Sequence, residues 1–203
     1  MKESSLEEEG GVLGWFIEHY KNTVLLGEGN FEFSNMLVSI GIPPLLATTD
    51  VLNSLPSGSF PTARANSMVG VDATALHSNH DFIAKIQRKR SGKINVVWNF
   101  PFITGEDENA TEHEILIRNT FLSVKLLFDG CIPMCGGLFC LGLQGDQFSR
   151  WNVLKSAWAV GWKLHAWDSY RYANFPGYTP RRLNGEAFPA GSTRFYIFKH
   201  GSR

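Results

Sequence analysis

The sequence predicts an α/β fold with one mostly parallel, seven-stranded sheet, an antiparallel last strand and helices on both faces. Short apolar runs alternate with segments of helical spacing along the 203 residues, which is typical of parallel strands joined by crossover helices. The last two apolar runs, residues 162–168 and 193–199, are joined by a segment rich in Pro, Gly and aromatic residues. We therefore expect the final strand to run antiparallel to its neighbours. The chain is long enough to bury a sizeable core in one domain.

The expected elements follow in chain order. Residues 1–21 form an N-terminal extension with a leading helix over 12–20, and residues 22–203 form a single domain. Strands are expected at residues 23–26, 45–49, 68–71, 94–98, 138–143, 162–168 and 193–199. Helices are expected at 31–40, 79–90, 112–128 and 151–160. In the helix over 112–128, the apolar residues at helical spacing are Ile115, Phe121, Leu122 and Leu126.

Composition places the chain among intracellular globular proteins. Hydrophobic residues make up 43% of the sequence and charged residues 19%, so the chain is expected to fold. The longest apolar stretch, residues 131–143, contains a proline and is too short to span a membrane. The first eleven residues hold four glutamates, which resembles neither a signal peptide nor a transit peptide.

The cysteines and histidines predict no metal site. Cys131, Cys135 and Cys140 have spacings that fit no common zinc pattern, and no histidine lies near them in sequence. Buried, reduced thiols are the expected alternative. His77 and His80 flank two polar residues, which favours a solvated loop over a metal site.

Charge is distributed unevenly although the net charge is zero. Residues 1–149 hold 10 Lys and Arg against 17 Asp and Glu, a net charge of −7, whereas residues 150–203 hold 9 against 2, a net charge of +7. The C-terminal part can therefore present a basic face to an anionic partner. A second basic run, residues 85–93, is expected to be the solvated end of a helix and the loop after it.

A glycine-containing turn follows the strand at 23–26. Gly27 and Gly29 lack a Cβ, so the turn can be tight and can approach a ligand closely. The segment Glu28, Asn30 and Phe31 completes a strand–turn–helix profile typical of a nucleotide-binding loop. It lacks the third glycine of a dinucleotide-binding loop and the Gly-Lys-Ser/Thr of a P-loop. An ordinary strand–helix turn remains the alternative.

Polar residues also follow the next two strands. Asp50 follows the strand at 45–49, where a carboxylate can accept hydrogen bonds from both ribose hydroxyls of a nucleoside. Asp72 and Ala73 follow the strand at 68–71, where an acid can bind an adenine amine. In both places the competing interpretation is a helix N-cap. Because the strands are parallel, these residues are expected at one edge of the sheet.

Asn99, Phe100 and Pro101 directly follow the buried strand at 94–98. Proline fixes the local backbone, so the Asn99 amide and the preceding carbonyl are held toward the cleft. An alternating sheet that ends in an antiparallel strand is characteristic of class I methyltransferases, and methyltransferases that act on planar nitrogens use a related Asn/Asp-Pro-Pro-aromatic loop. A strand ended by a proline is the alternative.

Together these motifs resemble the Rossmann-like domain family of the 25S rRNA (uridine-N3)-methyltransferase. The resemblance covers roughly residues 22–199 and rests on segments 27–34, 47–50, 70–74, 99–101, 151–152 and 175–182. It implies S-adenosylmethionine as cofactor, uridine N3 of ribosomal RNA as target and a role in ribosome biogenesis. It also implies a pre-ribosomal particle and other assembly proteins as partners, and a nucleolar or cytoplasmic location, with an organellar one left open.

The hypothesis assigns a role to each group of residues. Gly27 to Phe31, Asp50, Asp72 and Ala73 bind the cofactor, and Asn99, Phe100 and Pro101 position the target base. RNA would lie over the basic C-terminal part. Aromatic residues there, Tyr172, Phe175 or Tyr178, stack on an extruded base or else pack the loop onto the sheet. The proposed RNA contacts are Arg171, Tyr178, Arg181, Arg182 and Arg194.

Three alternatives stay open. A catalytically silent scaffold in ribosome assembly is favoured by the zero net charge, by the acidic segment 106–108, and by segment 141–148, which lacks a lysine that the family carries. A small-molecule methyltransferase would need a closed, largely uncharged pocket. An NAD-dependent oxidoreductase is disfavoured by the incomplete dinucleotide loop. No residue stands out as a general base, and His113 is expected on a helix surface.

Overall fold

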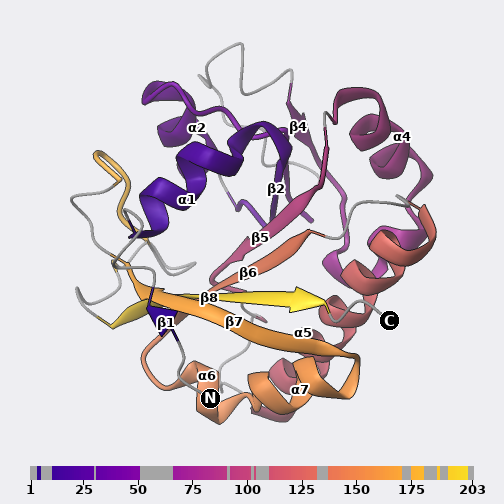
Figure 1. Ribbon diagram of the computed structural model, residues 1–203, viewed down its shortest axis with the longest axis vertical. Helices are drawn as coiled ribbons and strands as arrows, with labels where there is room; N and C mark the ends of the chain where they lie inside the picture. Colours follow the sequence, from indigo (N-terminus) through magenta and orange to yellow (C-terminus); the bar gives the residue numbers. More distant parts are fainter. Residues whose placement is uncertain are drawn as a thin grey trace.

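The computed structural model describes residues 4–5, 11–29, 31–50, 66–90, 92–101, 103, 110–131, 137–170, 175–180, 187 and 192–200. Within them one eight-stranded sheet runs in the order β1-β7-β8-β6-β5-β2-β3-β4 (Figure 1). The strands are β1 (Ser4–Ser5), β2 (Thr23–Leu26), β3 (Leu46–Thr48), β4 (Ser67–Met68), β5 (Asn95–Asn99), β6 (Leu138–Gln144), β7 (Trp162–Ser169) and β8 (Thr193–His200).

The sheet has the predicted seven strands and one short addition. Strands β2 to β6 pair in parallel, and β8 runs antiparallel to both β6 and β7, as the Pro-, Gly- and aromatic-rich connection before β8 predicted. The two-residue strand β1 pairs in parallel with β7 and was not expected. Because β2, β3, β5 and β6 are parallel, the residues that follow them meet at one edge of the sheet, which we call the carboxyl edge.

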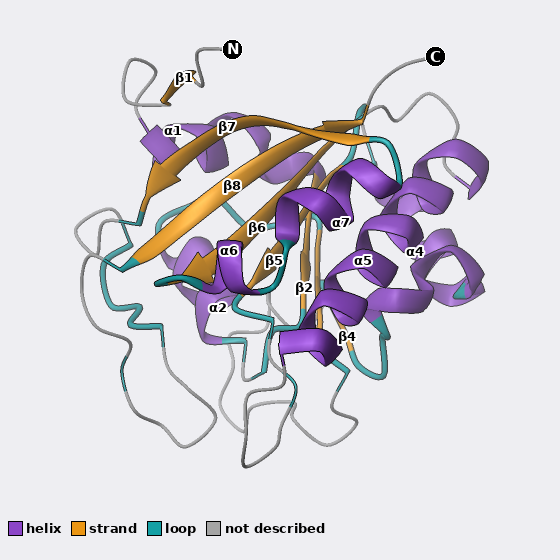
Figure 2. Ribbon diagram, turned by 90° about the horizontal axis from the view of Figure 1, so that it is seen from below, coloured by secondary structure: helices purple, strands orange, loops and turns teal. Residues whose placement is uncertain are grey.

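Helices cover both faces of the sheet (Figure 2). On one face, α1 and α2 pack against Leu25, Val97 and Phe195. On the other, α4, α5 and α7 pack against Val96, Phe139 and other strand residues. The helices are α1 (Gly11–His19), α2 (Glu32–Ser39), α4 (His80–Lys89), α5 (Ala110–Leu126), α6 (Gln147–Arg150) and α7 (Val153–Ala159), with short turns η2 (Tyr20–Asn22), η3 (Ala73–Ser78) and η4 (Leu127–Cys131).

The leading helix α1 belongs to the same packed core. Its Trp15 and Phe16 are buried, and the Phe16 ring meets Phe33 and Phe195 edge-on at 5.5 and 6.3 Å between centroids. Burial of such rings stabilises the fold by about 2–3 kcal/mol each. Residues 11–19 are therefore held on the α2 face of the sheet.

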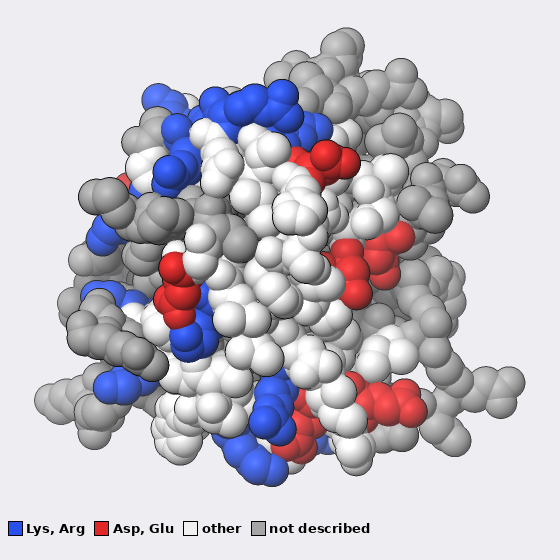
Figure 3. Space-filling view, turned by 90° about the vertical axis from the view of Figure 1, so that its right-hand side faces the viewer, with Lys and Arg blue, Asp and Glu red and all other residues white. Residues whose placement is uncertain are grey.

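Helix α5 buries a different side from the one that its apolar spacing indicated. Ile115, Leu122 and Leu126 are 52%, 40% and 38% exposed, whereas Phe121 is fully buried. The buried side also holds small and polar residues, and hydropathy alone does not predict that such residues are buried. Figure 3 shows the right-hand side of the molecule as seen in Figure 1, where uncharged atoms dominate the centre and Lys and Arg lie mainly toward the rim.

Local signals explain where other elements begin and end. The Asn79 side chain caps α4, because its Oδ1 accepts the Phe82 N–H at 3.0 Å. Gly41, at φ +83°, ends the α2 segment in a conformation that side chains disfavour. Every residue of β5 is buried, in keeping with its central place in the sheet. Strand β4 is shorter than predicted, since the chain passes into the unexpected turn η3.

No described helix combines the length and apolarity that crossing a bilayer requires. No cluster of three His, Cys, Asp or Glu side chains there is arranged to hold a metal ion. Cys140 is a free thiol inside the core, where burial raises its pKa. The side chains of Cys131 and Cys135 lie outside the described residues.

Candidate functional site

The loop after β2 turns at a glycine where any side chain would be both strained and crowded. Gly27 has φ +64°, and a Cβ placed there would lie 2.6 Å from Nε1 of Trp98 in β5. Both the backbone conformation and the space therefore require glycine. Gly29 differs, because a Cβ there would meet nothing within 4 Å and the residue is exposed. The predicted close turn is thus present at Gly27, while Gly29 faces open space.

Glu28 is a buried carboxyl that ties this loop together. Its Oε2 accepts the Ser34 backbone N–H at 2.9 Å, and its own N–H donates to the Thr48 carbonyl at 2.7 Å. Burial raises the pKa of Glu28 to about 7, although the hydrogen bonds from Ser34 oppose this. The Glu28 side chain therefore ties the loop to α2, and its backbone N–H ties the loop to β3. Asn30 lies outside the described residues.

Strained residues mark both loops at the carboxyl edge. Phe31, after β2, has φ 59°, and Phe100, after β5, has φ 53°. Bulky residues seldom adopt this left-handed conformation, and such strain clusters at functional sites. Phe31 is buried in the α2 face of the core, which holds its backbone in place. The Phe100 N–H donates to the Gly142 carbonyl at 2.9 Å, and this hydrogen bond holds the backbone of the second loop in place.

Asn99 presents a buried oxygen with no partner. The residue ends β5 and is 9% exposed, and its Oδ1 has no hydrogen-bond partner among the described residues. The side chain lies over Gly142 of β6, where a Cβ would come within 3.1 Å of Oδ1. A buried acceptor without a partner costs about 1–3 kcal/mol, so its retention calls for an explanation. Pro101, two residues after Asn99, is itself buried.

The two predicted cofactor carboxylates differ in their surroundings. Asp50 is exposed after β3. Asp72 caps η3, because its Oδ1 accepts the backbone N–H of Thr74 at 2.8 Å and the hydroxyl of the same residue at 2.7 Å. Asp72 is therefore the N-cap of η3 in this structure. Its other oxygen, Oδ2, makes no hydrogen bond within the described residues. Ala73 is half-buried at the start of η3.

His113 is buried, and its expected place on a helix surface is wrong. It is 1% exposed on α5, and its ring stacks on Trp151 with 4.2 Å between centroids. Its Nε2 accepts the Ile103 backbone N–H at 3.2 Å. His113 thereby links α5 to the segment that follows Asn99, Phe100 and Pro101. The spacing of His113 with Ile117, Phe121 and Val124 on α5 is the sequence signal that could have revealed it.

The predicted RNA contacts are only partly described. Arg194 is exposed on β8, with its guanidinium 5.0 Å from the centre of the Trp167 ring. Tyr178 is half-buried, and its ring packs on Phe33 at 4.9 Å. Phe175 is 1% exposed and stacks on Tyr170, so it packs the loop onto the sheet. The remaining predicted positions lie outside the described residues: Arg171, Tyr172, Arg181 and Arg182.

Comparison with known proteins identifies a family. Residues 24–182 match the sequence model of the family described as BMT5-like, rRNA (uridine-N3-)-methyltransferase BTM5-like. This span includes the loops after β2, β3, β4, β5 and β6. No curated protein matched the chain in a sequence search.

Solved structures share the fold at low sequence identity. A protein described as an antibiotic-related methyltransferase aligns with a TM-score of 0.53 at 12% identity, covering 99% of this chain and 96% of its own. A 30S ribosomal A1408 methyltransferase from an uncultured bacterium aligns at 0.52 and 12% identity, covering 98% and 96%. A mutant 16S rRNA (adenine(1408)-N(1))-methyltransferase from Catenulisporales acidiphilia aligns at 0.51 and 7% identity, covering 94% and 91%. These likenesses establish a Rossmann-like methyltransferase fold.

Proposed function

The chain belongs to the BMT5-like rRNA (uridine-N3-)-methyltransferase family, and we propose that it uses S-adenosylmethionine to methylate N3 of a uridine in ribosomal RNA. The observation that carries the proposal is the buried Oδ1 of Asn99, which lacks a partner at the carboxyl edge. An acceptor there suits a base whose ring nitrogen bears a hydrogen. N3 of uridine and N1 of guanosine do, whereas N1 of adenosine does not.

The residues of the carboxyl edge fit the proposed cofactor. Gly27 has no side chain, so a ligand can approach the backbone of the first loop closely. The buried Glu28 carboxylate holds that loop in place through the Ser34 N–H. Asp50 is exposed, so its carboxylate is accessible to ribose hydroxyls. Oδ2 of Asp72 is the atom proposed for the adenine amine, while Oδ1 stays with Thr74. When bound, S-adenosylmethionine supplies a methyl group made electrophilic by its sulfonium.

The chain's own contribution to catalysis is positioning. Asn99 Oδ1 accepts the N3–H and so orients the target base before that proton is lost, and the strained Phe100 lies directly after it in the same loop. An amide is no base, so the N3 proton passes to bulk water before transfer, which leaves an anionic ring nitrogen as the nucleophile. His113 acts as a positioning residue, because its Nε2 holds the Ile103 N–H four residues after Asn99.

Titration calorimetry and a methyl-transfer assay together test this function. We expect micromolar binding of S-adenosylmethionine and of its demethylated product, and transfer of labelled methyl to ribosomal RNA that maps to uridine N3. Absence of binding at millimolar ligand would refute the cofactor assignment. Methyl found only at adenine N1 would refute the target assignment, because that nitrogen offers no hydrogen to Asn99.

A second candidate is a silent scaffold subunit in ribosome assembly. The exposed apolar side chains of α5 and α7, at Ile115, Leu122, Leu126 and Trp158, favour it because such residues are typical of protein contacts. A scaffold would co-purify with a pre-ribosomal particle and tolerate Asn99→Ala. The proposed enzyme would lose methyl transfer in the same variant. A pre-ribosomal partner and a nucleolar or cytoplasmic location belong to both proposals.

A further inference from the structure

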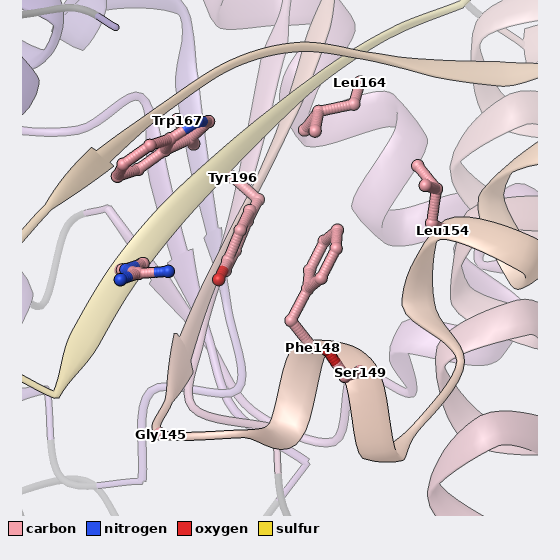
Figure 4. A pocket seen from close by; sticks show the side chains of 8 residues that line it. Gly145, Phe148, Ser149, Leu154, Leu164, Trp167 and Tyr196 are labelled. Atoms are coloured by element: carbon pink, nitrogen blue, oxygen red, sulfur yellow. The ribbon is translucent and has the colours of Figure 1, made fainter. Parts of the chain in front are cut away.

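A hollow on the α5 and α7 face of the sheet lies beside strands β7 and β8. It encloses about 250 Å³ between α6 and the strands, with Trp167 and Tyr196 on the strand side and Phe148 on the helix side (Figure 4). A second hollow of about 320 Å³ shares Phe148 and Leu154 with the first and continues to Trp158 on α7. Together they form one groove, which we call the β8–α7 groove. Sequence patterns gave no sign of it.

Aromatic rings dominate this groove. Phe148 stacks on Tyr196 with 4.1 Å between ring centroids and 17° between planes. Trp158 is 61% exposed, which is unusual for so large an apolar side chain. Trp167 is only partly buried and lies under the Arg194 guanidinium. The exposed ring of Trp158 provides a flat face on which a nucleobase can stack.

Positive charge accompanies the rings. The side chains that line the groove include Arg194 and Lys155, and none of the described lining residues is acidic. Lys155 also contacts the Glu114 carboxylate at 3.0 Å, so Arg194 is the cation more available to an anion. Its guanidinium contacts the Trp167 ring and Tyr196 instead of a described carboxylate. An arginine on an aromatic surface suits a phosphate next to a stacked base.

Strand register connects the groove to the carboxyl edge. Arg194 of β8 pairs with Leu143 of β6, and the adjacent Gly142 pairs with Asn99 of β5. The backbones of Arg194 and Asn99 therefore lie two strands apart, or about 10 Å. The Asn99 side chain points to the α2 face and the groove lies on the other face. A single strand of RNA that crosses the carboxyl edge can reach both.

We propose that the β8–α7 groove binds single-stranded RNA next to the target base, with Arg194 on a phosphate and a base stacked on Trp158. The inference rests on the proposed function, because it assumes an RNA substrate. It adds a second contact region outside the site built around Asn99. The groove would select an unpaired segment beside the target, since paired bases offer no free faces for stacking.

The test measures binding of a labelled single-stranded oligoribonucleotide by fluorescence anisotropy at fixed salt. We expect Trp158→Ala to weaken binding about tenfold and Arg194→Gln about fivefold. Ser149→Glu, which places an acid at an exposed position of the groove wall, should weaken it as well. The matched controls are Ile115→Ala, an exposed apolar residue of α5, and Lys199→Gln, an exposed cation at the far end of β8. Both should bind like the parent protein.

Cofactor titration separates the two proposals. The three groove variants should bind S-adenosylmethionine as the parent protein does, because none of them lies near the loop after β2. RNA binding and methyl transfer unchanged in all three would overturn the groove proposal and leave the enzyme standing. Groove-dependent RNA binding without any methyl transfer by the parent protein would overturn the proposed function alone. Equal losses in the two controls would also overturn the groove, because the effect would then be general.

Discussion

The loops after β2 and β5 lie at the same edge of the sheet, yet they treat their polar groups in opposite ways. In the first loop, Glu28 is buried and its carboxylate accepts the Ser34 N–H. In the second, Asn99 is just as buried, but its Oδ1 has no described partner. Both loops contain a strained phenylalanine, Phe31 and Phe100. The first loop therefore satisfies its own buried polar group, whereas the second holds a buried acceptor that no described residue satisfies.

The largest expected effect comes from breaking the shape of the first loop. Gly27→Ala adds a Cβ 2.6 Å from Trp98 Nε1 at φ +64°, so we expect a loss of about 2–4 kcal/mol in the free energy of unfolding. Gly29→Ala is the matched control, because a Cβ there meets nothing within 4 Å. Urea unfolding of the two variants measures the contrast. Equal stabilities would contradict the proposed packing of Gly27 on Trp98.

The second prediction concerns the pH dependence that Glu28 imposes. Its pKa is about 7 in the folded protein and 4.5 ordinarily, so the folded state binds more protons between these values. The free energy of unfolding should therefore fall as pH rises from 4.5 to 7, by roughly 3 kcal/mol in the limit. Glu28→Gln should remove this slope and be more stable than the parent protein at pH 8.

Stability curves at pH 5 and pH 8 measure this effect. The control is Glu18→Gln, an exposed residue of α1, which should keep the slope. A slope that survives in Glu28→Gln would show that another group causes it. A parent protein whose stability does not fall over this range would show that the Glu28 carboxyl is already charged.

The third prediction concerns the support of the second loop. His113→Gln keeps an acceptor near the Ile103 N–H but loses the ring stacked on Trp151, so we expect a stability loss of about 2 kcal/mol. His113→Ala also loses the acceptor, and methyl transfer should fall further. If His113 positions the loop, kcat falls while the KM for the cofactor stays constant, and the glutamine variant restores part of kcat. Equal kcat values in the two variants would contradict the positioning role and show that His113 contributes only to packing.

The smallest expected changes in stability come from replacing the two carboxylates of the proposed cofactor site, and they should differ between the two. Asp72→Ala removes the cap on Thr74 and should cost about 1 kcal/mol of stability. Asp50→Ala, at an exposed position, should change stability by less than about 0.5 kcal/mol. Calorimetry should nevertheless show weaker binding of S-adenosylmethionine in the Asp50 variant. Unchanged affinity there would remove Asp50 from the site.

Much of this architecture could be predicted from the sequence because its signals are local. Apolar β-branched runs located the strands, and the Pro-, Gly- and aromatic-rich composition of residues 169–192 predicted the antiparallel last strand. Parallel strands then brought Gly27, Asp50 and Asn99 to one edge without any knowledge of side-chain contacts. The two-residue strand β1 carries too little pattern to be detected in this way.

Features that depend on contacts between distant segments could not be predicted. The buried side of α5 includes His113, a polar residue whose burial follows from Trp151 and Ile103 rather than from its own hydropathy. In the sequence, Gly142 is an ordinary glycine of a strand. Its contact with Asn99 follows only from the pairing of β6 with β5. The β8–α7 groove exists where α6 and α7 leave part of the sheet uncovered, and no local pattern encodes that gap.

The central claim, that Asn99 Oδ1 is the acceptor for the target N–H, is tested most directly by single-turnover methyl transfer in Asn99→Ala. Stability and cofactor affinity are measured in parallel. The account predicts a fall of at least about 100-fold in the rate of transfer, with a cofactor Kd within about threefold of the parent value. A variant that transfers methyl to RNA within threefold of the parent rate would contradict it.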